Sequence, residues 1–309
     1  HDAMEKYGSD KPDVRFDMPI FALDELAEKS EFQVFKTVIA DGGVVRGLVV
    51  SGGAELSRKQ IDAYTELAKK YGLKGLAYVK VEEGCLSGGI SKFFNELLSR
   101  ELIQRSGAKS GDLIFFSADG WTTALTALGA VRLQIAKDLN LLDLKAYKAL
   151  WINDFPLVEK SEEEGRFIAM HHPFTSPRPE DENKMESDPE SVHALAYDLV
   201  LNGNEIAGGS IRIYREELQE KMFNVLGISS EDAHQKFGFL LDAFQYGAPP
   251  HGGIAFGFDR LVMILAGTDS IREVIAFPKT TTAQSPMDNA PDLVDKIQLK
   301  ELHLLIDNK

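Results

Sequence analysis

The segment YDLVLNGNEIAGGSIRI, residues 197–213, carries three charged residues seven positions apart: Asp198, Glu205 and Arg212. A two-residue turn at Asn202-Gly203 predicts a β-hairpin in which Asp198 and Glu205 share one sheet face, diagonally across the strands. Two carboxylates that close repel each other unless a cation lies between them, and hard oxygen ligands suit Mg²⁺. The hairpin therefore predicts a metal site. A three-residue turn would instead leave the two acids on opposite faces, as exposed strand residues.

Arg212 has the opposite parity to Glu205 in a regular strand. A β-bulge would bring the two onto one face, and Gly208-Gly209 is where we expect it. An inward arginine is suited to a bidentate clamp on a carboxylate. The alternative is a surface arginine on an amphipathic strand.

Two further stretches carry candidate binding groups. HGGIAFGFDR, residues 251–260, predicts a glycine-rich strand that turns into a helix and clears space for a flat ligand, with Arg260 available to an adenine ring or a phosphate. Packing alone is the alternative explanation of such a strand. His171 and His172 end an apolar strand, where alternation would let at most one of them face a given site; a structural histidine is the alternative. The sequence contains no phosphate-binding GxxxxGK[ST] loop, zinc-type spacing or GxSxG elbow.

Composition limits the class of protein. The chain has 309 residues, 44% of them hydrophobic and 27% charged, so it can bury a substantial core in one large domain or two. A formal net charge of −14 argues against a generally basic nucleic-acid-coating surface. The single cysteine, Cys85, excludes an internal disulfide framework and fits a reducing cytosol; we interpret it as a small, partly buried side chain rather than a nucleophile. No apolar run approaches the ~20 residues of a membrane span, so a cytoplasmic protein is expected.

The elements that would position these groups fall into two parts. Residues 32–50 predict a hairpin about Asp41-Gly42-Gly43, followed by alternating helices and strands that form a compact α/β or α+β unit. Its other predicted elements are helices at 57–71, 91–106 and 122–139 and strands at 75–81 and 112–118. After residue 140, long strands and short turns predict a mostly antiparallel sheet. These elements are strands at 149–160 and 165–174 around an acidic turn at 161–165, the hairpin, and helices at 216–226, 230–246 and 259–266.

Together the motifs resemble the bacterial aspartyl-tRNA synthetase family, within the class II aminoacyl-tRNA synthetases. The matching stretches occur in the family's order: YGSDKPD (7–13), AMHHPF (169–174), residues 197–213, FQYGAPPHGGIAFGFDRLVMIL (244–265) and IREVIAFPK (271–279). The resemblance implies an α+β fold, a mostly antiparallel class II catalytic sheet with flanking helices plus a smaller inserted α/β (GAD-like) domain. The expected organisation is a catalytic-core segment at 1–25, the inserted domain at 26–135 and the C-terminal catalytic part, with motif 3, at 136–309.

The resemblance also implies the activity: ATP- and Mg²⁺-dependent activation of L-aspartate to aspartyl-adenylate, then transfer to the acceptor end of tRNA. No side-chain nucleophile is required, because catalysis is mainly positioning and electrostatics. Arg212, with His171 and His172, would hold aspartate, and Asp198 and Glu205 would hold Mg²⁺. Residues assigned to ATP are Glu205, Gly257, Phe258, Asp259 and Arg260, and those assigned to catalysis are Arg260, Glu205 and Arg212.

The family's anticodon-binding barrel and its motifs 1 and 2 have no counterpart in these residues, and the chain begins without Met. We therefore expect a piece of a longer, homodimeric parent that does not aminoacylate tRNA at a useful rate alone. A second hypothesis is a non-catalytic nucleotide- or tRNA-acceptor-binding module. A third is a related ligase for asparagine or lysine, against which the inserted domain and the element ending in Arg212 argue.

Overall fold

A computed structural model describes residues 1–161 and 163–307. The chain divides into two compact units, His1–Ala255 and Phe256–Lys309. Among the described residues, no helix is long and apolar enough to cross a membrane.

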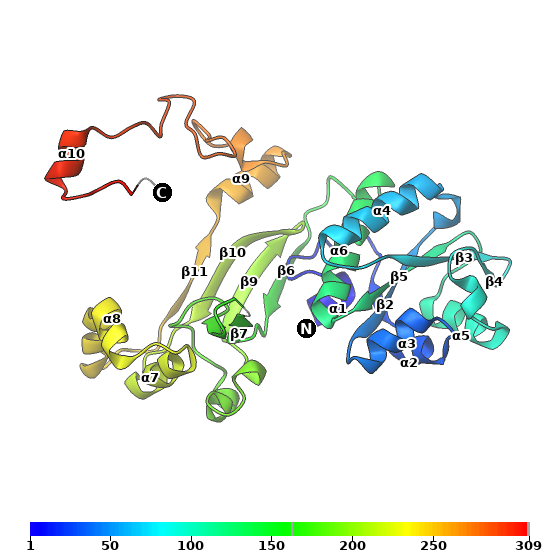
Figure 1. The fold of residues 1–309 in the computed structure, drawn as a ribbon, viewed down its shortest axis with the longest axis horizontal. Coiled ribbons are helices and arrows are strands. Elements are labelled where there is room, and N and C mark those ends of the chain that lie inside the picture. The colour runs from blue at the N-terminus through cyan, green and yellow to red at the C-terminus, as the bar shows by residue number, and fades with distance from the viewer. Residues whose placement is uncertain (162, 308–309) are drawn as a thin grey trace. The chain divides into compact units, whose positions relative to one another are not determined.

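The first half of the larger unit is built on a five-stranded sheet with the order β1-β2-β5-β3-β4 (Figure 1). Every pair of neighbouring strands in it is antiparallel, so α+β describes this part of the chain. Its strands are β1 Ile20–Ala22, β2 Val44–Val50, β3 Ala77–Glu82, β4 Cys85–Ser87 and β5 Leu113–Asp119. We call residues 16–138, which hold this sheet and its helices, the five-stranded region.

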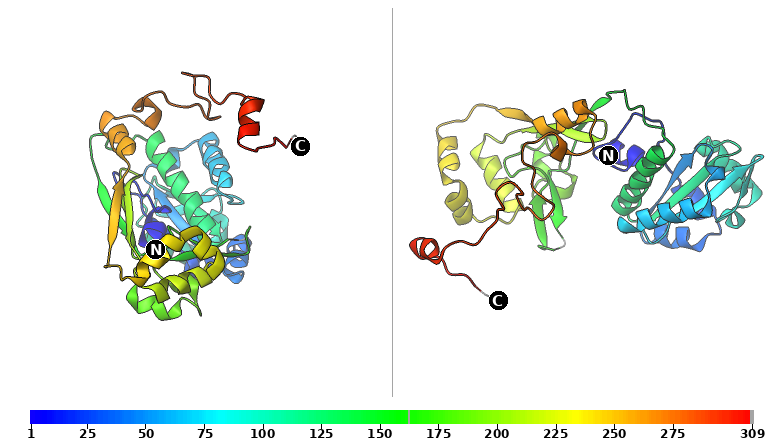
Figure 2. Two further views of the ribbon diagram at one scale, coloured as in Figure 1. Left: turned by 90° about the vertical axis from the view of Figure 1, so that its left-hand side faces the viewer. Right: turned by 90° about the horizontal axis from the view of Figure 1, so that it is seen from above.

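Helices cover both faces of this sheet, as the view from above in Figure 2 also shows. Packed against one face are α4 Arg58–Lys70 and α6 Trp121–Asp138; against the other are α2 Asp24–Lys29, α3 Gln33–Ala40 and α5 Glu96–Ser106. Alternate residues of the central strand β5 enter the two cores: Phe115 packs with α4 and α6, and Phe116 with the other three helices. Both rings are at most 1% exposed, as expected for a strand buried on both faces.

The hairpin predicted for residues 32–50 is wrong in its first arm. Residues 33–40 form helix α3, and only residues 44–50 form a strand. The β-branched content of this stretch suggested a strand, yet Phe35, Val38 and Ile39 recur at helical spacing. Phe35 is buried against Phe116, while Val34 on another side of the helix is exposed. The glycines after the helix end it: the N–H groups of Gly42 and Gly43 donate to carbonyls of its last turn.

A buried arginine ties the segment before β1 to α6. Arg132, 2% exposed, donates to the carbonyl oxygens of Met18 (2.7 Å) and Asp13 (3.1 Å). Its guanidinium also lies 4.0 Å from the centroid of the Phe16 ring. Desolvation by burial lowers the pKa of Arg132 to about 10, although the charges of Asp13 and Asp17 oppose this shift. The backbone of residues 13–18 is therefore held in place by a single side chain.

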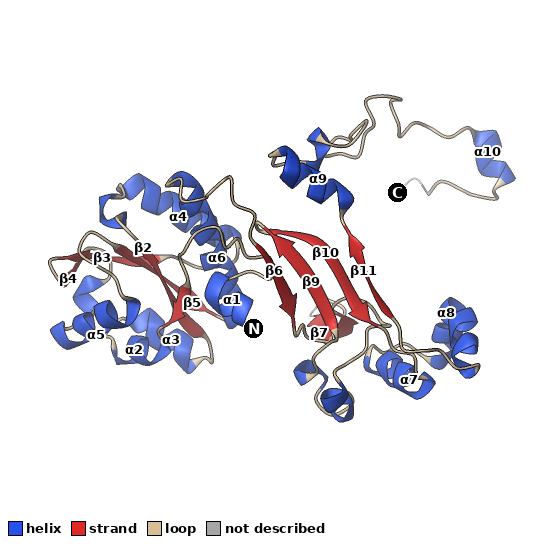
Figure 3. Ribbon diagram, turned by 180° about the vertical axis from the view of Figure 1, so that it is seen from behind, coloured by secondary structure: helices blue, strands red, loops and turns tan. Residues whose placement is uncertain are grey.

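The second half of the larger unit contains a four-stranded sheet with the order β11-β10-β9-β6, drawn in red in Figure 3. A two-stranded sheet, β7-β8, and two helices accompany it. The elements are β6 Ala149–Asn153, β7 Val158–Ser161, β8 Arg166–Ala169, β9 Ala196–Leu201, β10 Asn204–Ile211, α7 Glu216–Val225, α8 Ser230–Gln245 and β11 Gly252–Phe256. We call residues 149–255 the four-stranded region.

The long strand predicted at 149–160 is two strands that belong to different sheets. Asp154 has a positive φ of 60°, which breaks the extended chain, and Pro156 follows it. The acidic turn predicted at 161–165 includes Glu162, which lies outside the described residues.

The smaller unit begins with α9 Phe258–Ala266, which follows β11 directly. A long irregular segment then leads to the short helix α10 Lys296–Glu301, shown in red in Figure 1. A single 3₁₀ turn, Ile271–Glu273, interrupts that segment within the described residues.

Candidate functional site

The hairpin that carries the charged residues has the predicted two-residue turn. Asn202 and Gly203 both have positive φ, 50° and 80°, as a type I′ turn requires. Leu201 pairs with Asn204, and Val200 pairs with Glu205. Since residues directly opposite share a face, as do residues two apart on one strand, Glu205 and Asp198 lie on the same face of the sheet.

The bulge that turns Arg212 toward this face is present, but its predicted position is wrong. The pairing shifts between Glu205 and Ala207, so the extra residue is Ile206 rather than either glycine. Beyond the shift, Gly208 faces Asp198, and alternation through Ser210 carries Arg212 to the same face. Arg212 continues the extended chain, since its N–H donates to the His251 carbonyl (2.9 Å).

The two glycines are required for close contacts instead. A Cβ on Gly208 would lie 2.6 Å from Asp198 Oδ1 and 3.5 Å from Glu205 Oε1, so both carboxylates flank the space above this residue. A Cβ on Gly209 would lie 1.9 Å from the carbonyl oxygen of Gly253 on β11. Gly208 leaves room for the acids, and Gly209 lets the neighbouring strand approach.

Asp198 is a buried carboxylate with a raised pKa. It is 7% exposed, and desolvation, followed by the negative charge of Glu205, raises its pKa; the charges of His171 and Lys11 oppose this. A buried carboxylate beside a partly exposed one, over a glycine, fits a hard divalent cation. The described residues hold no cluster of three or more His, Cys, Asp or Glu that could bind a metal. The pair would therefore supply two ligands and leave the remaining positions of a Mg²⁺ ion to water or phosphate oxygens.

Arg212 is partly buried and incompletely bonded. Its Nη1 atom is inaccessible to water and has no hydrogen-bond partner among the described residues. A buried donor left unpaired costs free energy, and a guanidinium edge matches a carboxylate in two parallel hydrogen bonds. The side chain thus has the chemistry of an anion clamp that faces the same side of the sheet as the acidic pair.

Both histidines lie close to predicted site residues. They follow the end of β8 at Ala169, so strand alternation does not govern them. His171 packs edge-on against Phe155 (centroids 4.5 Å apart) and contributes to the electrostatics of Asp198. Desolvation by the surrounding protein, and then the positive charge of Arg212, lower the pKa of His172, although the residue is exposed. His172 Nδ1 accepts the N–H of Phe174 (3.2 Å).

Lys11 is a residue of this site to which the sequence analysis assigned no role. Its Nζ lies 3.2 Å from Glu205 Oε2. The contact joins residues 194 positions apart, and the one sequence signal for it was that YGSDKPD, residues 7–13, matches the family.

Four of the predicted ATP-binding residues belong to the smaller unit: Gly257, Phe258, Asp259 and Arg260. Gly257 precedes helix α9, and Asp259 and Arg260 lie in its first turn, as expected for the strand-to-helix junction. Their assignment to ATP rests on the motif.

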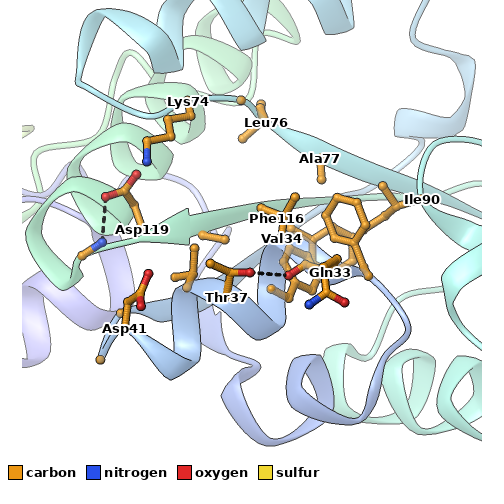
Figure 4. A pocket seen from close by; sticks show the side chains of 18 residues that line it. Gln33, Val34, Thr37, Asp41, Lys74, Leu76, Ala77, Ile90, Phe116 and Asp119 are labelled. Atoms are coloured by element: carbon orange, nitrogen blue, oxygen red, sulfur yellow. Dashed lines mark hydrogen bonds between the residues drawn. The ribbon is translucent and has the colours of Figure 1, made fainter.

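A cavity of about 760 Å³ lies elsewhere, between α3 and strands β3 and β5 (Figure 4). Val34, Ile90 and Phe116 line its apolar end, and Asp41, Lys74 and Asp119 its charged end. None of the predicted site residues lines it. Cys85, interpreted as partly buried, is exposed on β4.

Comparison with known proteins defines the class to which this fold and site belong. A family profile described as tRNA synthetases class II (D, K and N) matches residues 1–281. The chain is 55% identical over 306 residues to an aspartate–tRNA ligase of Halalkalibacterium halodurans, covering 99% of the chain and 51% of that protein. It is 53% identical to an aspartate–tRNA(Asp/Asn) ligase of Bacillus subtilis, covering 100% of the chain and 52% of that protein.

The chain therefore belongs to the class II aminoacyl-tRNA synthetases of the aspartate, lysine and asparagine group. It spans about half the length of the curated relatives that it matches. A solved structure, the aspartyl-tRNA synthetase of Entamoeba histolytica, aligns with 78% of this chain and 44% of that one, at 18% identity and a TM-score of 0.36.

Proposed function

We propose that this chain carries the aspartate-activating site of an aspartate–tRNA ligase. The observation that supports this most directly is the buried, unpartnered Nη1 of Arg212 on the same sheet face as Asp198 and Glu205. The names of the relatives indicate the substrates: aspartate and tRNA. ATP follows from the family. Residues 26–135 are proposed as an inserted domain, and the homodimer is proposed for the full-length parent.

Arg212 would bind the side-chain carboxylate of L-aspartate. Formation of the charge-assisted pair would satisfy the buried Nη1, whereas the neutral amide of asparagine would leave the guanidinium without its counter-charge. His171 and His172 would complete the amino-acid pocket. A largely neutral His172 beside Arg212 adds no second positive charge and can contribute a single hydrogen bond.

Asp198 and Glu205 would hold Mg²⁺. When bound, the ion would neutralise charge on the phosphates of ATP. Gly257, Phe258, Asp259 and Arg260 would bind the nucleotide, and Arg260 would contact the adenine and a phosphate. The contribution of the four-stranded region is to hold the amino-acid clamp and the metal ligands on one face of a sheet, so that attack of the aspartate carboxylate on the α-phosphate needs little reorganisation.

Calorimetry tests the assignment. We expect the chain to bind a non-hydrolysable aspartyl-adenylate analogue more tightly than the asparaginyl analogue, and Arg212→Met to remove this preference. Arg215→Met is a matched control, because Arg215 lies three residues away and pairs with Glu182 instead.

The outcomes separate the three hypotheses. Binding of ATP·Mg²⁺ without discrimination between the two analogues would support the non-catalytic module. Preference for the asparaginyl or a lysyl analogue would support a ligase for one of those amino acids.

A further inference from the structure

We propose that Lys11 is a built-in counter-cation of the Asp198–Glu205 pair, which a divalent metal must displace when it binds. This inference rests on the proposed function, because it assumes that the two carboxylates are the metal ligands. It concerns the chain before substrates arrive, and it assigns a role to a residue outside the hairpin.

The ammonium group of Lys11 lies where a cation is needed. Its Nζ is 3.2 Å from Glu205 Oε2, and its charge also acts on Asp198, where it counteracts the rise in that pKa. Asp198 Oδ1 and Glu205 Oε1 flank the space above Gly208. One positive charge thus partly neutralises two carboxylates that would otherwise repel each other.

The backbone on both sides of Lys11 is held in place. Before it, Gly8 adopts a left-handed conformation and packs so tightly on α6 that a Cβ would lie 2.1 Å from the Leu125 carbonyl oxygen. After it, Pro12 and Asp13 are buried, and Arg132 binds the Asp13 carbonyl. The loop is therefore positioned by the five-stranded region.

Asp13, in the same buried segment, also lies against the turn of the hairpin. A Cβ added to Gly203, at the turn, would lie 3.2 Å from Asp13 Cβ. The segment that presents Lys11 and the hairpin that presents Glu205 are thus in contact beside the ion pair. Because the backbones are fixed, the pair forms without ordering a loop, and the remaining freedom is in the lysine side chain.

The ammonium group of Lys11 is able to move away from Glu205. Lys11 is 43% exposed and Glu205 is 29% exposed, so the ammonium can exchange its carboxylate partner for water by rotating about its own bonds. An ion pair this exposed is weak, whereas a divalent ion between two carboxylates is held by both. Lys11 thus partly neutralises the carboxylates in the absence of metal and is displaced when the metal binds. This competition lowers the affinity for the metal.

A titration with Mn²⁺ as the sole ligand tests this competition. Electron paramagnetic resonance measures the free Mn²⁺ at each step. We expect Lys11→Met to bind Mn²⁺ about tenfold more tightly than the parent chain, because the ammonium group no longer competes with the metal for the two carboxylates. Lys11→Arg keeps the charge and should retain the parent affinity to within about twofold. Lys6→Met removes an exposed lysine of the same segment, whose nearest carboxylate, Asp2, is 4.0 Å away, and should change nothing.

A second readout follows the lysine itself. Acylation of Lys11 by a soluble N-hydroxysuccinimide ester, quantified by peptide mass spectrometry, should accelerate as Mn²⁺ saturates the site, because the displaced amine becomes accessible. Acylation of Lys6 should stay constant across the titration.

The double variant Asp198→Asn/Glu205→Gln distinguishes failure of the metal site from failure of the role of Lys11. If it binds Mn²⁺ as well as the parent chain, the metal assignment of the proposed function is wrong. If it loses Mn²⁺ while Lys11→Met leaves the affinity unchanged or weakens it, the metal assignment stands and the role of Lys11 is wrong. Tighter binding by Lys11→Met, together with metal-dependent acylation of Lys11, supports the proposal.

Discussion

The five-stranded and four-stranded regions differ in what their buried residues do. In the first, both faces of the sheet are covered by helices, and buried side chains such as Phe115 and Leu113 contact other apolar groups. In the second, the edge strand β11 is exposed along its whole length, and the buried or half-buried groups include Asp198 and Arg212. Apolar burial and the charged groups of the candidate site are therefore concentrated in different parts of one unit. Substitutions should therefore separate them.

The largest effect is expected from the core of the five-stranded region. Phe115→Ala should lower the free energy of unfolding by about 4 kcal/mol, because Phe115 is fully buried and packs edge-on against Tyr64. Urea denaturation measures this loss, and the affinity for the aspartyl-adenylate analogue should stay within about twofold below the transition. Val34→Ala, at a 52%-exposed position, is the control and should cost less than about 1 kcal/mol. Equal losses for the two variants would contradict the comparison.

Arg212→Met should produce the reverse pattern. Loss of the guanidinium should weaken binding of the aspartyl-adenylate analogue by about 3 kcal/mol, roughly a hundredfold, since the ligand carboxylate loses its charged partner. Stability should be unchanged or slightly higher, because the buried Nη1 has no partner to lose. Calorimetry and urea denaturation on the same preparation measure both quantities. A large loss of stability would show that Arg212 is a structural residue.

Gly208→Ala tests the space over the hairpin. The new Cβ would lie 2.6 Å from Asp198 Oδ1, so the carboxylate must move, and Mn²⁺ affinity should fall about tenfold. Gly253→Ala in the adjacent strand is the control, because nothing lies within 4 Å of the position its Cβ would take. Equal Mn²⁺ affinities in the two variants would remove Gly208 from the site.

The smallest effect concerns pH. The pKa of His172 is lowered in the folded chain from its ordinary 6.5, first by desolvation and then by Arg212. Between the lowered pKa of the folded chain and 6.5, the unfolded chain therefore binds more protons at His172. The contribution of His172 to stability rises with pH across this interval and is lost as the pH falls through it. In Arg212→Met the pKa of His172, followed by NMR titration, should move back up and the interval should narrow. No movement, or the same movement in Arg215→Met, would place Arg212 outside the electrostatic range of His172.

Local signals predicted the parts of the site that depend on neighbouring residues. The Asn202-Gly203 pair predicted the turn, its type and the shared face of Asp198 and Glu205, because type I′ geometry depends on the residues in the turn itself. Ser57 likewise predicted the start of α4, where it forms a capping box with Gln60.

Features that depend on tertiary contacts were mispredicted or missed. Residues 33–40 are β-rich in composition, yet their helical spacing suits the face that Phe35 packs against. The double glycine suggested the bulge, but the bulge falls on Ile206. Gly208 instead makes room for the two carboxylates, and Gly209 for the neighbouring strand β11. The Lys11–Glu205 pair joins distant parts of the chain, which no local pattern reports.

The bulge at Ile206 also has a consequence for how this hairpin can change in length. Deletion of that one residue would restore regular pairing and leave Gly208, Ser210 and Arg212 on the face of Glu205, because Gly208 already pairs with Asp198. Deletion of a second residue, between Gly208 and Arg212, would turn Arg212 over to the opposite face. The hairpin should therefore tolerate loss of the bulged residue, but a further single-residue deletion between Gly208 and Arg212 would separate the arginine from the acids.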